Sequence, residues 1–175
     1  MSKQGPETYG WTFTGAGRPE FALAPKPGQE SVWDYPRPPA IVDDPRLVEV
    51  FAADGTLLAS SHQAKRVLET ASPPTFYLPP TALVAALDAV AGSSFCEWKG
   101  QAEYFGYGGA PLAWRYPKPT QKFAEIAGWY AFYPAQCRCL VAGEGVRAQA
   151  GGFYGGWVTD EIIGPYKGEP GSSGW

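Results

Sequence analysis

A chain of 175 residues is long enough for one domain with its own core, but 22 glycines and 18 prolines interrupt it too often for long helices. Its 14 Lys and Arg residues face 17 Asp and Glu residues, so the net charge of -3 provides no basic field for gathering phosphates. We therefore expect short strands, many turns and no nucleic-acid partner.

The sequence also bears on the cellular compartment. Its N-terminal residues lack the apolar core of a signal peptide, and no apolar run is long enough to cross a bilayer. Three cysteines are an odd number, and Cys137 and Cys139 are separated by a single residue, so a framework of disulfides is not expected. These features predict a cytoplasmic protein with reduced thiols and no membrane partner.

Irregular structure is expected at the start of the chain. Residues 1–30 contain many glycines and prolines and show no sustained periodicity, which is typical of an arm rather than of a helix or strand. The first regular element is predicted to be a hairpin, because residues 47–51 and 57–60 flank the turn sequence Asp54-Gly55.

Two helices are predicted in the middle of the chain. Apolar residues share one helical face over 61–70, and Pro73-Pro74 forbids continuation. A strand is expected at 75–78. A second helix is then expected to open at Pro80, with apolar residues at helical spacing until Gly92 stops it.

The rest of the chain is predicted to form a meander of short strands, because each apolar segment is bounded by glycine or proline. The expected strands are residues 95–98, 101–107, 111–116, 128–133, 138–142 and 153–158. Alternation along a strand places Trp114 and Tyr116 on the same face. Residues from 164 onward return to the composition of a loop.

Few residues are available for metal or histidine chemistry. The soft metal ligands are His62, Cys96, Cys137 and Cys139, and a tetrahedral zinc site would need all of them. His62 is the only histidine, and its place among polar residues at the start of the first expected helix favours an exposed position over a catalytic one. The sequence contains no Gly-x-Ser-x-Gly and no Gly-x-x-x-x-Gly-Lys-Ser/Thr motif. We expect no metal and no cofactor.

Residues 94–104 hold more potential chemistry than any other segment, including the thiol of Cys96 and the ammonium group of Lys99. A neighbouring cation can lower the pKa of a thiol and make it a nucleophile. Positions 96 and 99 face opposite sides of a flat strand, so a contact between them requires a bend at Gly100. The alternative is that Cys96 is simply a small buried hydrophobe.

Other polar and aromatic residues are expected to meet this segment. Lys99 needs a partner if it points inward, and Glu69, near the end of the first expected helix, is a candidate, with Arg66 completing a charged cluster. The alternative is a solvated ion pair of little consequence. The aromatic residues expected to wall a pocket are Tyr77, Trp98, Tyr104, Trp114 and Tyr116. Such a wall favours a flat or cationic ligand, and core packing is the alternative for each ring.

Several segments between residues 30 and 135 follow one another in a specific order and spacing. They are Glu30-Ser31-Val32-Trp33-Asp34-Tyr35-Pro36-Arg37-Pro38-Pro39, Leu68-Glu69-Thr70, Pro73-Pro74-Thr75-Phe76-Tyr77-Leu78-Pro79, Cys96-x-Trp98-Lys99-Gly100-x-Ala102-x-Tyr104, Ala113-Trp114-x-Tyr116-Pro117-x-Pro119 and Ala131-Phe132-Tyr133. This series resembles a bacterial and fungal family called domain of unknown function 427. Residues 151–159 are similar to a C-terminal extension found in part of that family.

The resemblance implies a mainly β fold of the Mss4-like, or β-tent, group, with short antiparallel strands and one or two short helices. The expected division is an irregular arm over 1–30, the family β domain over 31–142 and a glycine-rich extension over 143–175 packed on the same domain. Many relatives in that fold group carry Cys-x-x-Cys zinc knuckles, which this sequence lacks. The family is sometimes labelled a nucleotidyltransferase, a label that these residues do not support, and fold kinship alone assigns no function.

Three hypotheses for the function follow. In the first, a small ligand binds in an aromatic-lined pocket that contains the polar pair Glu69 and Lys99. In the second, the protein is an enzyme in which Cys96 is a nucleophile or redox thiol, assisted by Lys99, with Glu69 as proton acceptor. In the third, the aromatic surface and the N-terminal arm mediate contact with a protein partner or a homodimer.

Overall fold

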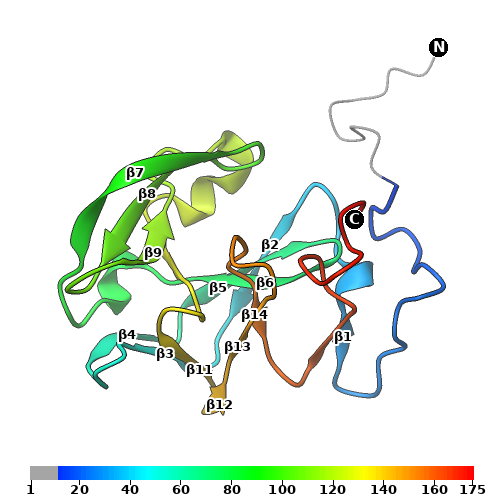
Figure 1. The fold of residues 1–175 in the computed structure, drawn as a ribbon, viewed down its shortest axis with the longest axis horizontal. Coiled ribbons are helices and arrows are strands. Elements are labelled where there is room, and N and C mark those ends of the chain that lie inside the picture. The colour runs from blue at the N-terminus through cyan, green and yellow to red at the C-terminus, as the bar shows by residue number, and fades with distance from the viewer. Residues whose placement is uncertain (1–11) are drawn as a thin grey trace.

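The computed structural model describes residues 12–175, and the first part of the expected arm, residues 1–11, lies outside the described residues. Within residues 12–175 the fold is mainly β, with several antiparallel sheets and helical structure confined to short 3-10 turns (Figure 1). The predicted fold class of short antiparallel strands is therefore confirmed. No helix of this part of the chain has the length and apolar character needed to cross a membrane.

The larger sheets are antiparallel. The first contains β7 (Asp88–Cys96), β8 (Gly100–Gly106), β9 (Pro111–Arg115) and β10 (Tyr130–Phe132), in the order β10-β9-β8-β7. The second contains β3 (Val48–Phe51), β4 (Leu57–Ser61), β11 (Arg138–Val141) and β12 (Glu144–Gly145), in the order β12-β11-β3-β4. The third contains β2 (Ala40–Asp44), β5 (Ala64–Glu69) and β6 (Ser72–Tyr77), in the order β2-β5-β6.

Smaller elements connect these sheets. The strand pairs are β1 (Glu30–Ser31) with β15 (Ile162–Ile163), which is parallel, and β13 (Arg147–Ala148) with β14 (Trp157–Val158), which is antiparallel. The 3-10 turns are η1 (Val32–Asp34), η2 (Pro80–Ala82) and η3 (Gln121–Ile126). In Figure 1 the C-terminal segment lies beside the N-terminal arm, and the stacked rings of Phe21 and Trp175, with centroids 5.1 Å apart, hold the two together.

The predicted hairpin is confirmed as the pair β3 and β4. Its turn is closed by the carboxylate of Asp54, which accepts a hydrogen bond of 2.9 Å from the backbone N–H of Thr56. Gly55 follows with φ +87, a conformation that a glycine adopts without a steric penalty. Local turn chemistry therefore determines this element.

The first predicted helix is wrong, because residues 64–69 form β5. This strand is central in its sheet and is buried on both faces, so Ala64 packs in one hydrophobic cluster and Val67 in another. Two buried faces produced the spacing that resembles a helix. Pro73 and Pro74 lie in β6, an edge strand of that sheet, where a missing N–H is tolerated.

The second predicted helix is also wrong. Only Pro80–Ala82 form a 3-10 turn, and the chain then extends into β7, whose pairing with β8 is not visible in local periodicity. Gly92, with φ +114, marks an irregularity in the register between Val90 and Ser93 rather than the end of a helix. Distant strand pairing outweighs helical propensity here.

The C-terminal extension is part of the main core. Trp157 in β14 is fully buried, its ring stacks on Phe76 at 4.7 Å, and its indole N–H donates a 3.0 Å hydrogen bond to the carbonyl oxygen of Phe132. β14 thereby packs against β6. An isolated bridge between Leu78 and Tyr130 joins the third sheet to the first, and this junction positions the pocket described next.

Candidate functional site

A pocket of about 600 Å³ lies between the first sheet and the strands β5 and β6. Its lining residues are Glu69, Thr75, Tyr77, Ser94, Phe95, Cys96, Glu97, Trp98, Lys99, Tyr104, Trp114, Tyr116, Tyr133, Gly152, Phe153, Tyr154 and Gly155. Strand alternation explains the convergence, because register places Tyr104 beside Trp114, which in turn lies beside Ala131. The same face therefore carries the rings of neighbouring strands.

The structure brings together every residue of the sequence-based site except Arg66. The residues that line the pocket are Glu69, Tyr77, Cys96, Trp98, Lys99, Tyr104, Trp114 and Tyr116. Arg66 instead donates hydrogen bonds of 3.0 and 3.2 Å to Glu30, and its Nε lies 3.4 Å from Asp44. It belongs to a separate charged cluster, and so it is not part of the pocket.

The hairpin between β7 and β8 turns at residues 97–99. Cys96 pairs with Gly100 across the hairpin, and Gly100 has φ +97, which supplies the bend that the sequence argument required. Thr120 Oγ1 fixes the turn by donating a 2.7 Å hydrogen bond to the carbonyl oxygen of Trp98. Lys99 Nζ lies 5.8 Å from the ring centre of Tyr116, within the range of a cation–π interaction.

The ion pair expected between Glu69 and Lys99 is not formed among the described residues. Glu69 Oε1 instead lies 3.5 Å from Nε of Arg37, whose side chain is 1% exposed. Burial lowers the pKa of Arg37, and the nearby carboxylates of Glu69 and Glu97 oppose this effect. The carboxylate of Glu69 thus compensates a buried cation, while the ammonium group of Lys99 lies over the rings of Tyr116 and Phe123.

Phenol groups give the pocket its polar character. Burial raises the pKa of Tyr77, Tyr116 and Tyr133, and neighbouring phenol and thiol groups reinforce the shift. For Tyr116 the neighbour is the thiol of Cys96, and for Tyr133 it is the hydroxyl of Tyr104. These groups therefore remain neutral hydroxyls at ordinary pH.

Aromatic contacts hold the walls in place. Trp114 packs edge-on to Tyr77, with ring centres 6.4 Å apart, and lies 4.3 Å from the ring of Tyr133. Gly155 closes over the indole of Trp114, because a Cβ at this position would lie 2.2 Å from Cη2. Only glycine permits this approach.

Sequence reasoning missed several lining residues. Tyr133 shares a strand face with Ala131, so alternation along residues 128–133 was a signal that places it beside Trp114. The glycine pairs that flank Phe153 and Tyr154 were a second signal, since glycine in such a run marks close backbone approach. Ser94, whose Oγ lies 2.5 Å from the hydroxyl of Tyr104, had no distinctive pattern.

The residues present do not fit the zinc knuckle of the β-tent group. Within residues 12–175, no group of three or more His, Cys, Asp or Glu side chains is arranged to hold a metal ion. Cys137 and Cys139 lie together, with Sγ atoms 3.8 Å apart, but Cys96 belongs to a different hydrophobic cluster. His62 is exposed beside the carbonyl oxygen of Pro45. No step of chemistry is therefore assigned to zinc.

Comparison with known families places these residues in context. The family described as Domain of unknown function (DUF427) matches residues 40–143. The chain belongs to the DUF427 family. A search of curated proteins finds no match. The DUF427 region contains the pocket residues from Glu69 to Tyr133, whereas Gly152, Phe153, Tyr154 and Gly155 come from the segment that follows it.

Proposed function

We propose that this DUF427 protein binds a small planar molecule in the pocket between the first sheet and strands β5 and β6. The observation that carries the proposal is the convergence of aromatic rings and neutral phenol hydroxyls from separate strands on one cavity of about 600 Å³. Pockets of this size that combine apolar walls with a few directed polar groups are typical of small-molecule sites.

The lining chemistry indicates the kind of molecule. Rings such as Trp114 and Trp98 offer flat surface for stacking, and neutral phenols donate hydrogen bonds to carbonyl or ring-nitrogen acceptors. Because burial raises the pKa values of Tyr116 and Tyr133, these donors are retained across the physiological range, whereas Tyr77 is fully buried and serves as packing behind them. Because a phenol hydroxyl also accepts a hydrogen bond, a flat heteroaromatic molecule with a polar ring atom, such as an indole, meets these requirements.

A thermal-shift screen of a metabolite library tests the proposal. We expect at least one flat heteroaromatic compound to raise the melting temperature of the wild type and of Trp129→Ala, but not of Trp98→Ala. Trp129 is a matched control because it lines a different cavity, beside Lys65. Stabilisation that persists undiminished in Trp98→Ala, or a complete screen without a hit, would contradict ligand binding in this pocket.

The enzyme hypothesis uses the same pocket, because Cys96 lines it. The neutral phenol of Tyr116 neighbours this thiol in the pocket, whereas Lys99 Nζ lies over the rings of Tyr116 and Phe123. This arrangement favours recognition over thiol activation, which requires a cation directed at the sulfur. Cys96→Ser should therefore retain the stabilisation by the ligand, and a hit that the wild type converts but Cys96→Ser does not would favour the enzyme hypothesis.

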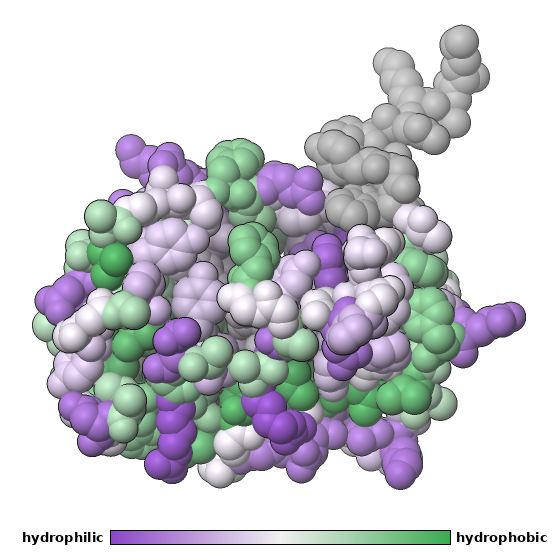
Figure 2. Space-filling model, in the orientation of Figure 1, coloured by the Kyte–Doolittle hydropathy of each residue, from purple (hydrophilic) through white to green (hydrophobic). Residues whose placement is uncertain are grey.

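The interaction hypothesis draws on two exposed rings near the pocket. Phe95 and Phe153 are both 79% exposed and both contribute to the lining. Apolar and hydrophilic residues are interspersed over the face shown in Figure 2, which is less favourable for a stable dimer than a continuous apolar patch. Light scattering that shows a dimer abolished by Phe95→Ser and Phe153→Ser would favour this alternative.

We also propose a cytoplasmic location, supported by the three free cysteines.

A further inference from the structure

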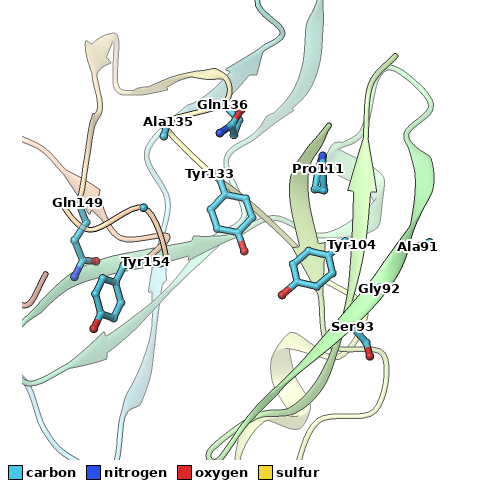
Figure 3. A pocket seen from close by; sticks show the side chains of 11 residues that line it. Ala91, Gly92, Ser93, Tyr104, Pro111, Tyr133, Ala135, Gln136, Gln149 and Tyr154 are labelled. Carbon is cyan, nitrogen blue, oxygen red and sulfur yellow. The ribbon is translucent and has the colours of Figure 1, made fainter. Parts of the chain in front are cut away.

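A second cavity of about 470 Å³ adjoins the pocket (Figure 3). The two share Tyr104, Tyr133, Gly152 and Tyr154 as lining residues, so they are neighbouring compartments of one groove. We call the first compartment the aromatic chamber and the second, lined also by Ser93, Gln136 and Gln149, the neutral chamber. The lining of the neutral chamber spans β7, β8, the segment after β10 and the C-terminal extension.

The two chambers differ in charge. The aromatic chamber contains the side chains of Glu69, Glu97 and Lys99. Among the described residues that line the neutral chamber, none is an acidic or basic residue, and its polar side chains are hydroxyls and amides. Burying an ionised group without a counter-ion is costly, whereas an amide finds both donors and acceptors in such a lining.

Tyrosine hydroxyls form the boundary between the chambers. In Figure 3 the hydroxyl groups of Tyr104 and Tyr133 are directed into the same space, and the pKa of Tyr133 is raised by burial with a smaller contribution from Tyr104. Ser94 extends this row with an Oγ that lies 2.5 Å from the hydroxyl of Tyr104. A molecule that crosses the boundary therefore meets groups that both donate and accept hydrogen bonds.

The amides of the neutral chamber differ in mobility. Gln149 is buried, and its Nε2 donates a 2.6 Å hydrogen bond to the carbonyl oxygen of Lys167, so the orientation of its side chain is fixed. Gln136 is exposed, and its side chain has no hydrogen-bond partner within residues 12–175. The fixed amide of Gln149 and the unconstrained amide of Gln136 can together bind a ligand group that both donates and accepts hydrogen bonds.

We infer that the neutral chamber receives an uncharged, amide-like substituent of the same ligand whose ring occupies the aromatic chamber. The ligand class is then a planar ring that carries a neutral hydrogen-bonding chain. This inference rests on the proposed function, because the ring must occupy the aromatic chamber for the chain to reach across the tyrosine boundary. The inference adds the requirement that the ligand carry a neutral hydrogen-bonding substituent, which ring binding alone does not impose.

Three probes that share an indole ring test the inference by isothermal titration calorimetry. 3-Methylindole provides the ring alone, N-acetyltryptophanamide adds two neutral amides, and tryptophan adds charged groups to the same ring. Because its two amides add several hydrogen bonds of modest net strength, we expect N-acetyltryptophanamide to bind about tenfold or more tightly than 3-methylindole. Tryptophan should gain nothing over 3-methylindole, since its charged groups find no counter-ion in the neutral chamber.

Variants test whether the tighter binding of N-acetyltryptophanamide, relative to 3-methylindole, arises in the neutral chamber. Gln136→Ala, and Ala135→Leu as a filling variant, should each reduce the gain while leaving the affinity for 3-methylindole unchanged. Gln121→Ala, an exposed glutamine in η3, is the matched control and should behave as the wild type. Trp98→Ala should weaken the binding of every probe, because it alters the aromatic chamber.

The outcomes separate the inference from the proposed function. If 3-methylindole binds but N-acetyltryptophanamide gains nothing, or if the gain persists in both Gln136→Ala and Ala135→Leu, the inference is overturned and ring binding stands. If none of the probes binds although the thermal-shift screen finds a ligand for this pocket, the inference is overturned and the proposed function stands; if the screen also gives no hit, both are contradicted. If tryptophan equals N-acetyltryptophanamide, the neutral character of the substituent is wrong.

Discussion

Strand β5 separates two polar regions whose side chains have different kinds of partner. On one side, Arg66 lies in a charged cluster with Glu30 and Asp44, in which each ionised group has an oppositely charged neighbour within the chain. On the other side, Glu69 borders a cavity whose remaining polar groups are mostly neutral phenols. The same strand thus contributes to a cluster of mutually paired charges and to a pocket open to a ligand.

This difference indicates how polar residues divide between stability and recognition. Arg46 donates hydrogen bonds of 2.6 Å to Asp44 and 2.7 Å to Glu161, so the charged cluster joins β2 to the segment before β15. It leaves little capacity for an external molecule. Tyr104 and Tyr133 line the pocket and are partly exposed, so a ligand can reach their hydroxyls.

The largest effect is expected from breaking the charged cluster. Asp44→Asn removes the charge of a side chain that is 4% exposed and that compensates Arg46 and Arg66. Arg66 and Arg46 would each keep one carboxylate, Glu30 and Glu161, but loss of the buried charge between them should lower the free energy of unfolding by about 2–4 kcal/mol. Urea unfolding followed by circular dichroism measures this change.

Its neighbour provides the control. Asp43 is on the same strand, but its side chain is 82% exposed and pairs only with Lys65 among the described residues. Asp43→Asn should change the free energy of unfolding by less than about 0.5 kcal/mol. Equal effects of the two substitutions would mean that the charged cluster has no special role in stability.

The next effect is expected from breaking the pocket. Gly155→Ala places a methyl group against Trp114, which is 7% exposed and held by Tyr77 and Tyr133, so the ring has little room to yield. We expect a loss of about 1–3 kcal/mol in stability and a shift in tryptophan fluorescence. Gly145→Ala is the control, since no atom lies within 4 Å of a Cβ there. An unchanged Gly155→Ala protein would show that the loop does not pack on the ring.

The prediction of the fold from sequence succeeded where local chemistry is decisive. The hairpin around Asp54 and Gly55 was predicted because turn residues fix it within a few positions. The helix over 61–70 was wrong because the apolar spacing of a strand buried on two faces resembles that of a helix, whereas the helix from Pro80 was wrong because the chain there extends into the mostly exposed strand β7. Pairing between distant strands decided both segments, and periodicity does not reveal it.

In the candidate site, too, residues that are close in sequence were predicted correctly, whereas contacts between distant segments were not. Residues such as Trp98 and Lys99 were found because they are close in sequence, and the sequence also indicated the bend at Gly100. Arg66 was assigned to the wrong side, since a strand places it away from Glu69 whereas a helix would place the two on one face. The covering loop at 152–155 was missed because its contact with Trp114 spans a long stretch of chain.

Acid should act on the charged cluster rather than on the phenols. Burial opposes ionisation of Glu30 and Asp44, but hydrogen bonds from Arg66 and Tyr35 to the former, and from Arg46 to the latter, lower both pKa values. A depressed folded-state pKa contributes stability above the unfolded pKa, and this contribution is lost as pH falls, here below about pH 4–5. Urea unfolding across this range should show the decline.

A variant identifies the source of the acid effect. Glu30→Gln cannot titrate, so its stability should be lower than that of the wild type at neutral pH and should fall less steeply on acidification. Parallel pH profiles for the two proteins would contradict a contribution from Glu30. The phenols of the pocket remain neutral over this range and should not contribute to the difference.

Alkali should produce the smallest effect, and it acts on the pocket. The raised pKa values of Tyr77, Tyr116 and Tyr133 mean that the unfolded chain releases phenol protons first, so their contribution is full below about pH 10 and is lost as pH rises further. Ultraviolet absorbance should show fewer ionised tyrosines at about pH 11 in the folded protein than in urea. Because burial also raises the pKa of Tyr35 in the charged cluster, Tyr133→Phe is needed to isolate the pocket. This variant should reduce the number of resistant phenols by one, and an unchanged difference between folded and unfolded protein would place Tyr133 in contact with solvent.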